Sequence, residues 1–365
     1  METQQVKLER KALEMFCQQV FQKLGVAEED AGIVANVLVT ADAMDIPSHG
    51  VIRTRRYVEG LKSGLMRPSA EIETLVDTPS SIVVHAHGAM GAPISAKIMR
   101  SVIRKAKTNG SAFGCVRDSN HFGIAGYYAR MALQEDMIGI AMTNTGTLGV
   151  PTFGRQTMYG TNPIAFAAPA GQKPPFVLDM STTVVTRGKL ELYERMEKEL
   201  PPGWAVDKTG KSANEAGPVL KDMLAHLGGG ILPLGGFGKE HSGHKGYGLA
   251  VMVDILSAVL CGAPFGKNVF DTPESYARVS HFFGAIKISC FRDPQEFRQD
   301  MDQMLQDLND CPVAEGEERV WFAGQPEFEQ EQTSRQYGIR VLQKTYTDLC
   351  TLGKEYAVQV PPTLS

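Results

Sequence analysis

The strongest constraint on the fold is an alternation of short apolar runs with helical segments and Gly-rich turns between residues 80 and 289. Short apolar runs bounded by turn residues are typical of strands, and the segments between them have helical periodicity. The runs lie at residues 81–85, 112–116, 138–142, 164–168, 176–178 and 285–289. This alternation predicts an α/β domain over residues 79–291.

One unit within this region is especially clear. A strand at 112–116 leads through a polar loop into a helix at 124–134 and then into a strand at 137–143. This order predicts a β-α-β crossover, which is right-handed if the two strands are parallel.

Helical patterns flank the α/β region on both sides. Apolar residues recur at helical spacing through the first forty residues,. After the last strand, Asp293-Pro294-Gln295-Glu296 combines an N-cap, a proline at the first helical position and a capping-box glutamate,. No low-complexity linker separates the flanks from the rest. The sequence therefore predicts one helical subdomain made of residues 1–78 and 292–365.

Composition excludes several classes of function. The chain has 365 residues, 43% of them hydrophobic, and a net charge of −4, so no electrostatic attraction to nucleic acid or anionic membrane is expected,. Residues 1–7 are polar, which argues against a secretion signal,. The longest apolar run, 249–265, contains Asp254 and Pro264 and predicts a buried helix rather than a membrane span,. Six cysteines without a CxxC pair predict free thiols in a reducing cytoplasm,.

The segment 45–57 carries the most suggestive side chains. Pro47 and Ser48 predict a helix that begins at His49, with Ser48 as its N-cap,. On that helix His49, Arg53 and Tyr57 recur every four residues and share one face. An imidazole, a guanidinium and a phenol are the groups needed to hold and reduce a 2-oxo acid. The alternative is a polar helix face whose arginines only solvate it.

A second candidate site is the loop Ser119-Asn120-His121-Phe122-Gly123. It follows a strand and precedes a helix, where free backbone N–H groups favour an anion,. Ligands of open α/β sheets also tend to bind at the carboxyl ends of strands. His121 is therefore a candidate acid/base or cofactor contact. The alternative is a turn histidine bonded to backbone.

Three further loops offer polar groups. The glycine-rich run 228–238 continues to a helix start at which His244 and Lys245 stand, as in a phosphate site; a mobile surface loop is the alternative,. The loops 143–145 and 160–163 offer short polar side chains for a small ligand. Asp179 follows a strand, where it could accept ribose hydroxyls, orient a histidine or cap the next helix.

Several familiar sites are missing from the sequence. It contains no GxGxxG after the first strand, no GxxxxGK[ST] loop, no HExxH helix and no GxSxG turn,. The pairs His85/His87 and His241/His244 bring no cysteine or carboxylate at a recognised ligand spacing,. The sequence therefore predicts no metal site.

Taken in order, these segments resemble the malate/L-lactate dehydrogenase family that lacks the Rossmann fold. The matching stretches are Ser48-His49-Gly50 with Arg53 and Tyr57, Ser119 to Gly123, Gly160-Thr161-Asn162-Pro163, Leu178-Asp179-Met180-Ser181, and Leu234-Gly235-Gly236 followed by His244-Lys245-Gly246-Tyr247-Gly248-Leu249. The resemblance spans most of the chain and accounts for the missing GxGxxG. It implies a non-Rossmann NAD(P)-binding α/β domain with a mixed sheet, plus a helical subdomain.

The resemblance also implies roles for individual residues. His49 would donate the proton to the substrate carbonyl, with Ser48 and Asp179 orienting it, and His121 is the rival acid/base. Arg53 would bind the substrate carboxylate, and Tyr57 and Thr161 would also contact the substrate. The residues implied to hold NAD or NADP are His121, Phe122, Gly123, Asp179, Met180, Ser181, His244, Lys245 and Gly246.

The expected activity is hydride transfer between a nicotinamide and a 2-oxo or 2-hydroxy acid, most directly malate, in a homodimer as the family implies. One alternative is reduction of a cyclic imine 2-carboxylate. From other classes, the alternatives are a metal-dependent hydrolase using His85, His87, His121 and His241, and a catalytically silent binding protein. Two segments depart from the family: the C-terminal turn at 320–327, which lacks a Pro-Gly-Glu sequence, and the long charged stretch 191–225.

Overall fold

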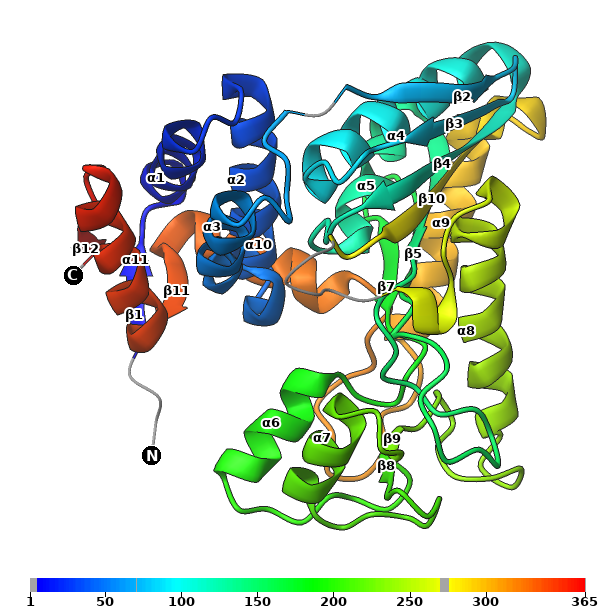
Figure 1. Ribbon diagram of the computed structural model, residues 1–365. Coiled ribbons are helices and arrows are strands. Elements are labelled where there is room, and N and C mark those ends of the chain that lie inside the picture. The colour runs from blue at the N-terminus through cyan, green and yellow to red at the C-terminus, as the bar shows by residue number, and fades with distance from the viewer. Residues whose placement is uncertain (1–4, 70, 270–275, 365) are drawn as a thin grey trace.

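The computed structural model describes residues 5–69, 71–269 and 276–364, and it consists of a sheet-based body, a helical body beside it and a small subdomain below (Figure 1). Residues 1–4 of the polar N-terminal segment lie outside the described residues.

A mixed sheet of seven strands forms the centre of the described α/β region, in the order β2-β3-β4-β10-β5-β6-β7. Strands β3 and β4 are parallel, and every other neighbouring pair is antiparallel. The bounds are β2 (Glu73–Asp77), β3 (Ser81–His85), β4 (Ser111–Ser119), β10 (Val279–Lys287), β5 (Met137–Thr143), β6 (Ile164–Ala168) and β7 (Phe176–Met180). The predicted mixed α/β fold is confirmed.

The predicted crossover unit exists, but its strands are not neighbours. Strand β4 leads through α5 (Ala125–Met131) into β5. Strand β10 lies between them and pairs antiparallel with both. A strand from late in the chain thus fills the gap, which local sequence patterns cannot show.

Helices cover both faces of the sheet. Helix α4 (Gly91–Asn109) and α5 pack on one face. Helix α8 (Gly243–Ser257) contacts β4, β5 and β10 from the other face. Helix α9 (Pro294–Asn309) lies on that same face, against the aromatic side chains of β6 and β7. The carboxylate of Asp293 accepts the N–H groups of Gln295 and Glu296, as the sequence predicted.

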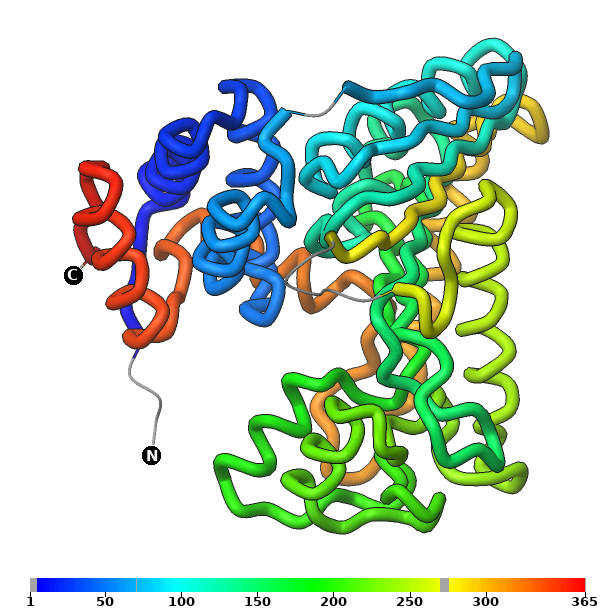
Figure 2. Tube along the Cα trace, in the orientation of Figure 1, coloured from blue at the N-terminus to red at the C-terminus, as the bar shows by residue number. Residues whose placement is uncertain are grey.

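The sequence predicts that residues from 292 onward belong to the helical subdomain. Helix α9, which begins at Pro294, packs on the sheet and is therefore described with the α/β body. The helical body instead contains α1 (Arg10–Lys23), α2 (Glu28–Ala43), α3 (Thr54–Lys62), α10 (Gln325–Tyr337) and α11 (Gln343–Tyr356). Strand β1 (Gln5–Leu8) pairs antiparallel with β11 (Ile339–Leu342) and with β12 (Thr363–Leu364). Figure 2 shows these blue and red segments side by side. Segments from the two ends of the chain therefore lie together in the helical body.

Helix α8 differs from the buried helix that the sequence predicted. Together with the following turn it is long and apolar enough to cross a membrane by composition, yet only a third of this stretch is buried. Its sheet-facing side packs through Val253, while Val251, Ile255 and Val259 are exposed. The prediction was wrong because apolar composition does not show which side of a helix the chain covers, and one apolar side of α8 is left exposed,.

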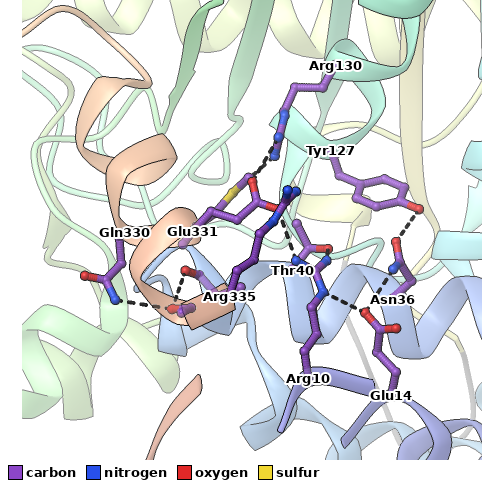
Figure 3. Close-up of polar contacts among 12 residues, drawn as sticks. Arg10, Glu14, Asn36, Thr40, Tyr127, Arg130, Gln330, Glu331 and Arg335 are labelled. Carbon is purple, nitrogen blue, oxygen red and sulfur yellow. Dashed lines mark hydrogen bonds and ion pairs between the residues drawn. The ribbon is translucent and has the colours of Figure 1, made fainter. Parts of the chain in front are cut away.

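A buried ionic network joins the helical body to the sheet (Figure 3). The carboxylate of Glu331 on α10 pairs with Arg10 of α1 at 3.1 Å, with Arg130 of α5 at 3.1 Å and with Arg335 at 3.3 Å. Burial alone raises the pKa of Glu331, but the charge of Arg130 and the hydrogen bonds from Arg10 and Arg130 outweigh it and leave the pKa lowered. Helix α10 is thereby fixed to both bodies.

The charged stretch 191–225 belongs to the small subdomain. This subdomain contains α6 (Arg187–Arg195), α7 (Ala216–Leu224) and the short pair of strands β8 (Ala205–Val206) and β9 (Gly230–Ile231). These elements have a core of their own, centred on Leu190, Leu220 and Ile231, and the ring of Trp204 lies 4.8 Å from that of Tyr193. The stretch is thus a folded unit beside the site.

Candidate active site

The predicted helix beginning at His49 is wrong. Residues Pro47–His49 and Val51–Arg53 form two single 3₁₀ turns, and the α-helix begins only at Thr54. Between the turns Gly50 is extended, with φ −82° and ψ −156°. The chain therefore bends at Gly50, which puts His49 and Arg53 on separate turns.

Asp42 causes this bend. Its buried carboxylate accepts the Val51 N–H at 2.7 Å and occupies the space beside Gly50. A Cβ at position 50 would lie 2.0 Å from Asp42 Oδ1, so only glycine fits. Burial raises the pKa of Asp42 to about 8, with the Val51 N–H acting in the opposite direction. A buried carboxyl thus shapes the turn that carries the candidate catalytic residues.

Despite the bend, the predicted polar residues converge. The rings of His49 and His121 stack with centroids 5.5 Å apart, and Tyr57 Oη lies 2.6 Å from His121 Nδ1. Ser48 Oγ lies 2.9 Å from His49 Nδ1, and Arg53 Nε donates to the Ser48 carbonyl at 2.6 Å. The alternative of a merely solvated helix face is therefore disfavoured. His121 Nδ1 also accepts the N–H of Gly123 at 3.3 Å, so the backbone bond of a turn histidine is present beside the contact with Tyr57.

The cluster is electrostatically unusual. Desolvation, with a contribution from Arg53, lowers the pKa of His49 to about 4. Desolvation also lowers the pKa of His121 well below its usual value, and burial raises the pKa of Tyr57 to about 12. Both imidazoles are therefore neutral at pH 7, and perturbed groups that share one site are typical of functional sites.

Positive charge gathers around Arg53 from two directions. Desolvation first and then the charges of Arg56 and Arg187 lower the pKa of Arg53, while Glu191 acts in the opposite sense. Arg187 and Glu191 lie on α6, so the small subdomain comes close enough to influence the site. The guanidinium of Arg53 bonds to the Ser48 carbonyl, and no described acidic residue pairs with it. Such a group is suited to a substrate carboxylate.

The floor of the site holds a histidine that sequence reasoning missed. His281 on β10 is fully buried, and its ring lies parallel to that of Phe122 with centroids 4.5 Å apart. Its Nδ1 is 2.8 Å from Thr143 Oγ1, and burial lowers its pKa to about 3. No local pattern marks it, because its neighbours come from strands far away in the chain.

Asp179 stands at the carboxyl end of β7 and bonds to a helix other than the one expected. Its Oδ2 accepts the N–H of Gly126, in the first turn of α5, at 2.7 Å. Its side chain is exposed to the open cavity, yet the surrounding chain removes enough water to raise its pKa to about 6; the Gly126 N–H opposes this shift and Glu327 adds to it. Next to it, Met180 is half-buried and Ser181 donates to the Thr183 carbonyl.

The two short polar loops mainly brace α8. The buried amides of Asn144 and Asn162 donate to the carbonyls of Pro264 and Ala250, so neither side chain is free for a ligand. Thr161 is half-buried, and its carbonyl accepts a hydrogen bond from Thr182. Its proposed contact with the substrate stays a prediction.

A cavity of about 360 Å³ is lined by residues of the segments that carry the histidines, of β7 and of the turn 321–328. Ile46 and Ile124, each three residues from His49 or His121, line it, although neither histidine does. Asp179, Trp321 and Glu327 line it as well. A largely apolar cavity with few polar groups suits a nucleoside. The C-terminal turn at 320–327 thus lines the cavity, although it lacks the Pro-Gly-Glu sequence of the family.

Other predicted residues lie elsewhere. His244, Lys245 and Gly246 form the first turn of α8, which packs on the sheet face opposite α5. His85 and His87 stack together but bond to Asp118 and Glu73, and His241 bonds to a backbone carbonyl. In the described ranges no three His, Cys, Asp or Glu side chains gather as metal ligands. The histidines of the hydrolase alternative are thus not brought together.

Comparison with known proteins finds similarity over almost the whole chain. The family model described as malate/L-lactate dehydrogenase matches residues 8–350. The malate dehydrogenase of Pyrococcus horikoshii is 41% identical over 97% of this chain and 96% of its own length. The L-sulfolactate dehydrogenase of Methanocaldococcus jannaschii is 36% identical over 93% of this chain and 94% of its own. The crystal structure of malate dehydrogenase from Entamoeba histolytica superposes with a TM-score of 0.94 at 32% identity, covering 98% of this chain and all of that one.

Proposed function

The chain belongs to the malate/L-lactate dehydrogenase family and is a 2-hydroxyacid dehydrogenase, and we propose that malate and oxaloacetate are its substrate pair. The observation that carries the proposal is the cluster of His49, Arg53, Tyr57 and His121, which combines a proton-transfer group with a cation for a carboxylate. A nicotinamide cofactor, NAD or NADP, would supply or accept the hydride when bound.

The arginines support a substrate with two carboxylates. We propose that the Arg53 guanidinium binds the carboxylate next to the reacting carbon, where its planar fork fixes the orientation. Arg56 and Arg187 add positive charge close to Arg53. Lactate carries one carboxylate, whereas malate offers a second anionic group. Arg187, which is exposed and pairs with Glu191, is the proposed partner of that second carboxylate.

His49 is proposed to move the proton. In the free protein its pKa is about 4, so it is neutral and ready to accept a proton from a hydroxy acid. Ser48 Oγ at Nδ1 leaves Nε2 for the substrate. Because Arg53 contributes to the low pKa of His49, a carboxylate bound to Arg53 would raise that pKa and favour the proton-donating form for reduction. Substrate binding and proton supply are thereby coupled.

The residues of the cavity are proposed to hold the cofactor. Asp179 fixes the N-terminus of α5, and Phe122 and Gly123 lie in the loop that leads into it. The apolar wall around Trp321 would shelter the adenine,. Contacts from His244, Lys245 and Gly246 stay predictions, since these residues lie on the other sheet face.

We further propose a homodimer and a cytoplasmic location. The exposed apolar side chains of α8, including Val251 and Ile255, support a second copy packed on that helix,. All six cysteines are free thiols, which supports a reducing compartment,. Light scattering of the purified protein measures the first of these proposals directly.

The test of the function is loss of NADH and, separately, NADPH absorbance with oxaloacetate, pyruvate and piperideine-2-carboxylate. Oxaloacetate should give the highest kcat/KM, and pyruvate a value at least about tenfold lower because the second carboxylate is missing. Turnover of the imine alone would move the protein to the reductase alternative. No turnover of any of the three would contradict the proposed substrates.

A further inference from the structure

The cavity is lined by a carboxylate, that of Glu327, which has no partner among the described residues. Glu327 lies in the first turn of α10 and lines the cavity with Asp179. Among the described residues Glu327 makes no hydrogen bond or ion pair, and it is close enough to Asp179 to add to the rise in that carboxyl group's pKa. Two carboxylates thus face one small cavity.

The position of Glu327 is fixed by the turn before it. Gly324 has φ +89°, and a Cβ there would lie 2.8 Å from the Val177 side chain, so the turn packs directly on β7. The Val177 N–H also donates to the Ala323 carbonyl at 3.0 Å. Because β7 carries Asp179, this attachment keeps Glu327 and Asp179 on adjoining walls.

The one cation among the described residues lining the cavity is already engaged. Arg130 donates to Glu331 at 3.1 Å and to the sulfur of Met44 at 3.5 Å (Figure 3). The buried Glu331 carboxylate would lose a partner if Arg130 turned toward a ligand phosphate. The available charge of the cavity is therefore negative.

From this arrangement we infer that Glu327 makes the cavity select a nucleotide with a free ribose 2′-hydroxyl, so that the enzyme binds NAD(H) in preference to NADP(H). The inference rests on the proposed function, in which the reacting ring lies by His49 and the other end of the dinucleotide enters the cavity. A carboxylate accepts hydrogen bonds from ribose hydroxyls but repels a 2′-phosphate.

The experiment is direct binding, which needs no turnover. Dissociation constants of NADH and NADPH are measured by fluorescence titration, and those of 5′-AMP and 2′,5′-ADP by calorimetry. The variant is Glu327→Gln, which removes the charge but keeps the shape and a side chain able to form a capping box. The matched control is Glu296→Gln, in the first turn of α9, which removes an exposed pairing with Arg292 away from the residues that line the cavity.

The wild type should bind NADH at least about tenfold more tightly than NADPH, as expected for a like charge at the 2′ position. Glu327→Gln should narrow the ratio of the two dissociation constants several-fold by tightening the binding of NADPH and 2′,5′-ADP, and Glu296→Gln should leave the ratio unchanged. Equal or tighter NADPH binding by the wild type, or an unchanged ratio in Glu327→Gln, would overturn the inference alone. Binding of neither dinucleotide would overturn the proposed function with it.

Discussion

The helical body and the α6–α7 subdomain both bring an arginine to the site, but they hold it differently. Arg53 follows a turn shaped by the buried Asp42 carboxyl, and its Nε is bonded to the Ser48 carbonyl. Arg187 is exposed and pairs only locally with Glu191, at 2.7 Å. The helical body shares the main core of the protein, whereas the subdomain relies on a small core of its own. The proposed catalytic groups thus lie on the rigid side, and the second cation lies on the side that can adjust.

The largest effect is expected from breaking the ionic network around Glu331, which fixes α10 to the helical body and to the sheet. Glu331→Ala removes the buried carboxylate that the half-buried guanidiniums of Arg10 and Arg130 share, which should cost about 3–5 kcal/mol of unfolding free energy,. Glu329→Ala on the same helix breaks an exposed pair and should cost less than about 1 kcal/mol,. Urea unfolding measures both, and equal losses would contradict the structural role of the network.

The matching change in the subdomain is Leu190→Ala. Leu190 is fully buried in the small core, so truncation should cost about 2–5 kcal/mol locally,. Hydrogen exchange should rise over residues 187–231 while α1 and α2 stay protected. If protection is lost equally in both bodies, the two regions are one cooperative unit and the contrast between them is wrong.

A smaller loss of stability but a clear loss of activity is expected for Gly50→Ala. The new Cβ would collide with the Asp42 carboxylate, and overpacking of this kind typically costs about 1–3 kcal/mol,. Because the turn must shift, kcat/KM for oxaloacetate should fall while dinucleotide binding persists. Gly32→Ala on α2 is the control, since the added Cβ would come no closer than 3.6 Å to its nearest neighbour, the Gln18 side chain. Full activity in Gly50→Ala would show that the bend is not required.

The smallest effect is a displaced pH profile. Malate oxidation needs neutral His49, and the lowered pKa means that protonation, and with it loss of kcat/KM, sets in only as the pH falls toward about 4,. An ordinary histidine would already lose activity near pH 6.5. If kcat/KM instead fell near pH 6.5, and the pH of this fall changed in Ser48→Ala, the pKa of His49 would not be lowered by desolvation and the account of this residue would be contradicted.

The sequence predicted much of the fold, because strand and helix patterns are local. Strands 81–85 and 164–168 were placed to the residue, as was the cap at Asp293. What failed depends on distant contacts: the insertion of β10 between β4 and β5, the exposed side of α8, and the bend at Gly50 imposed by Asp42.

The site shows the same division. Spacing within 48–57 and the loop at 119–123 identified the residues that converge, although the helix invoked to align them is not continuous. His281 was missed as a site residue because only the fold brings it to Phe122 and the histidines. Trp321 and Glu327 lie in the turn at 320–327, which the resemblance singled out only as a departure from the family and which the fold brings to the cavity.

The most direct test of the account is the single-turnover rate of NADH oxidation by oxaloacetate in His49→Ala and His121→Ala, each saturated with both ligands. The account predicts that His49→Ala slows the chemical step by about 10²–10⁴-fold, the usual contribution of a general acid. His121→Ala should weaken binding and leave that step within about tenfold of the wild type. A normal step in His49→Ala together with its loss in His121→Ala would contradict the assignment and exchange the two roles.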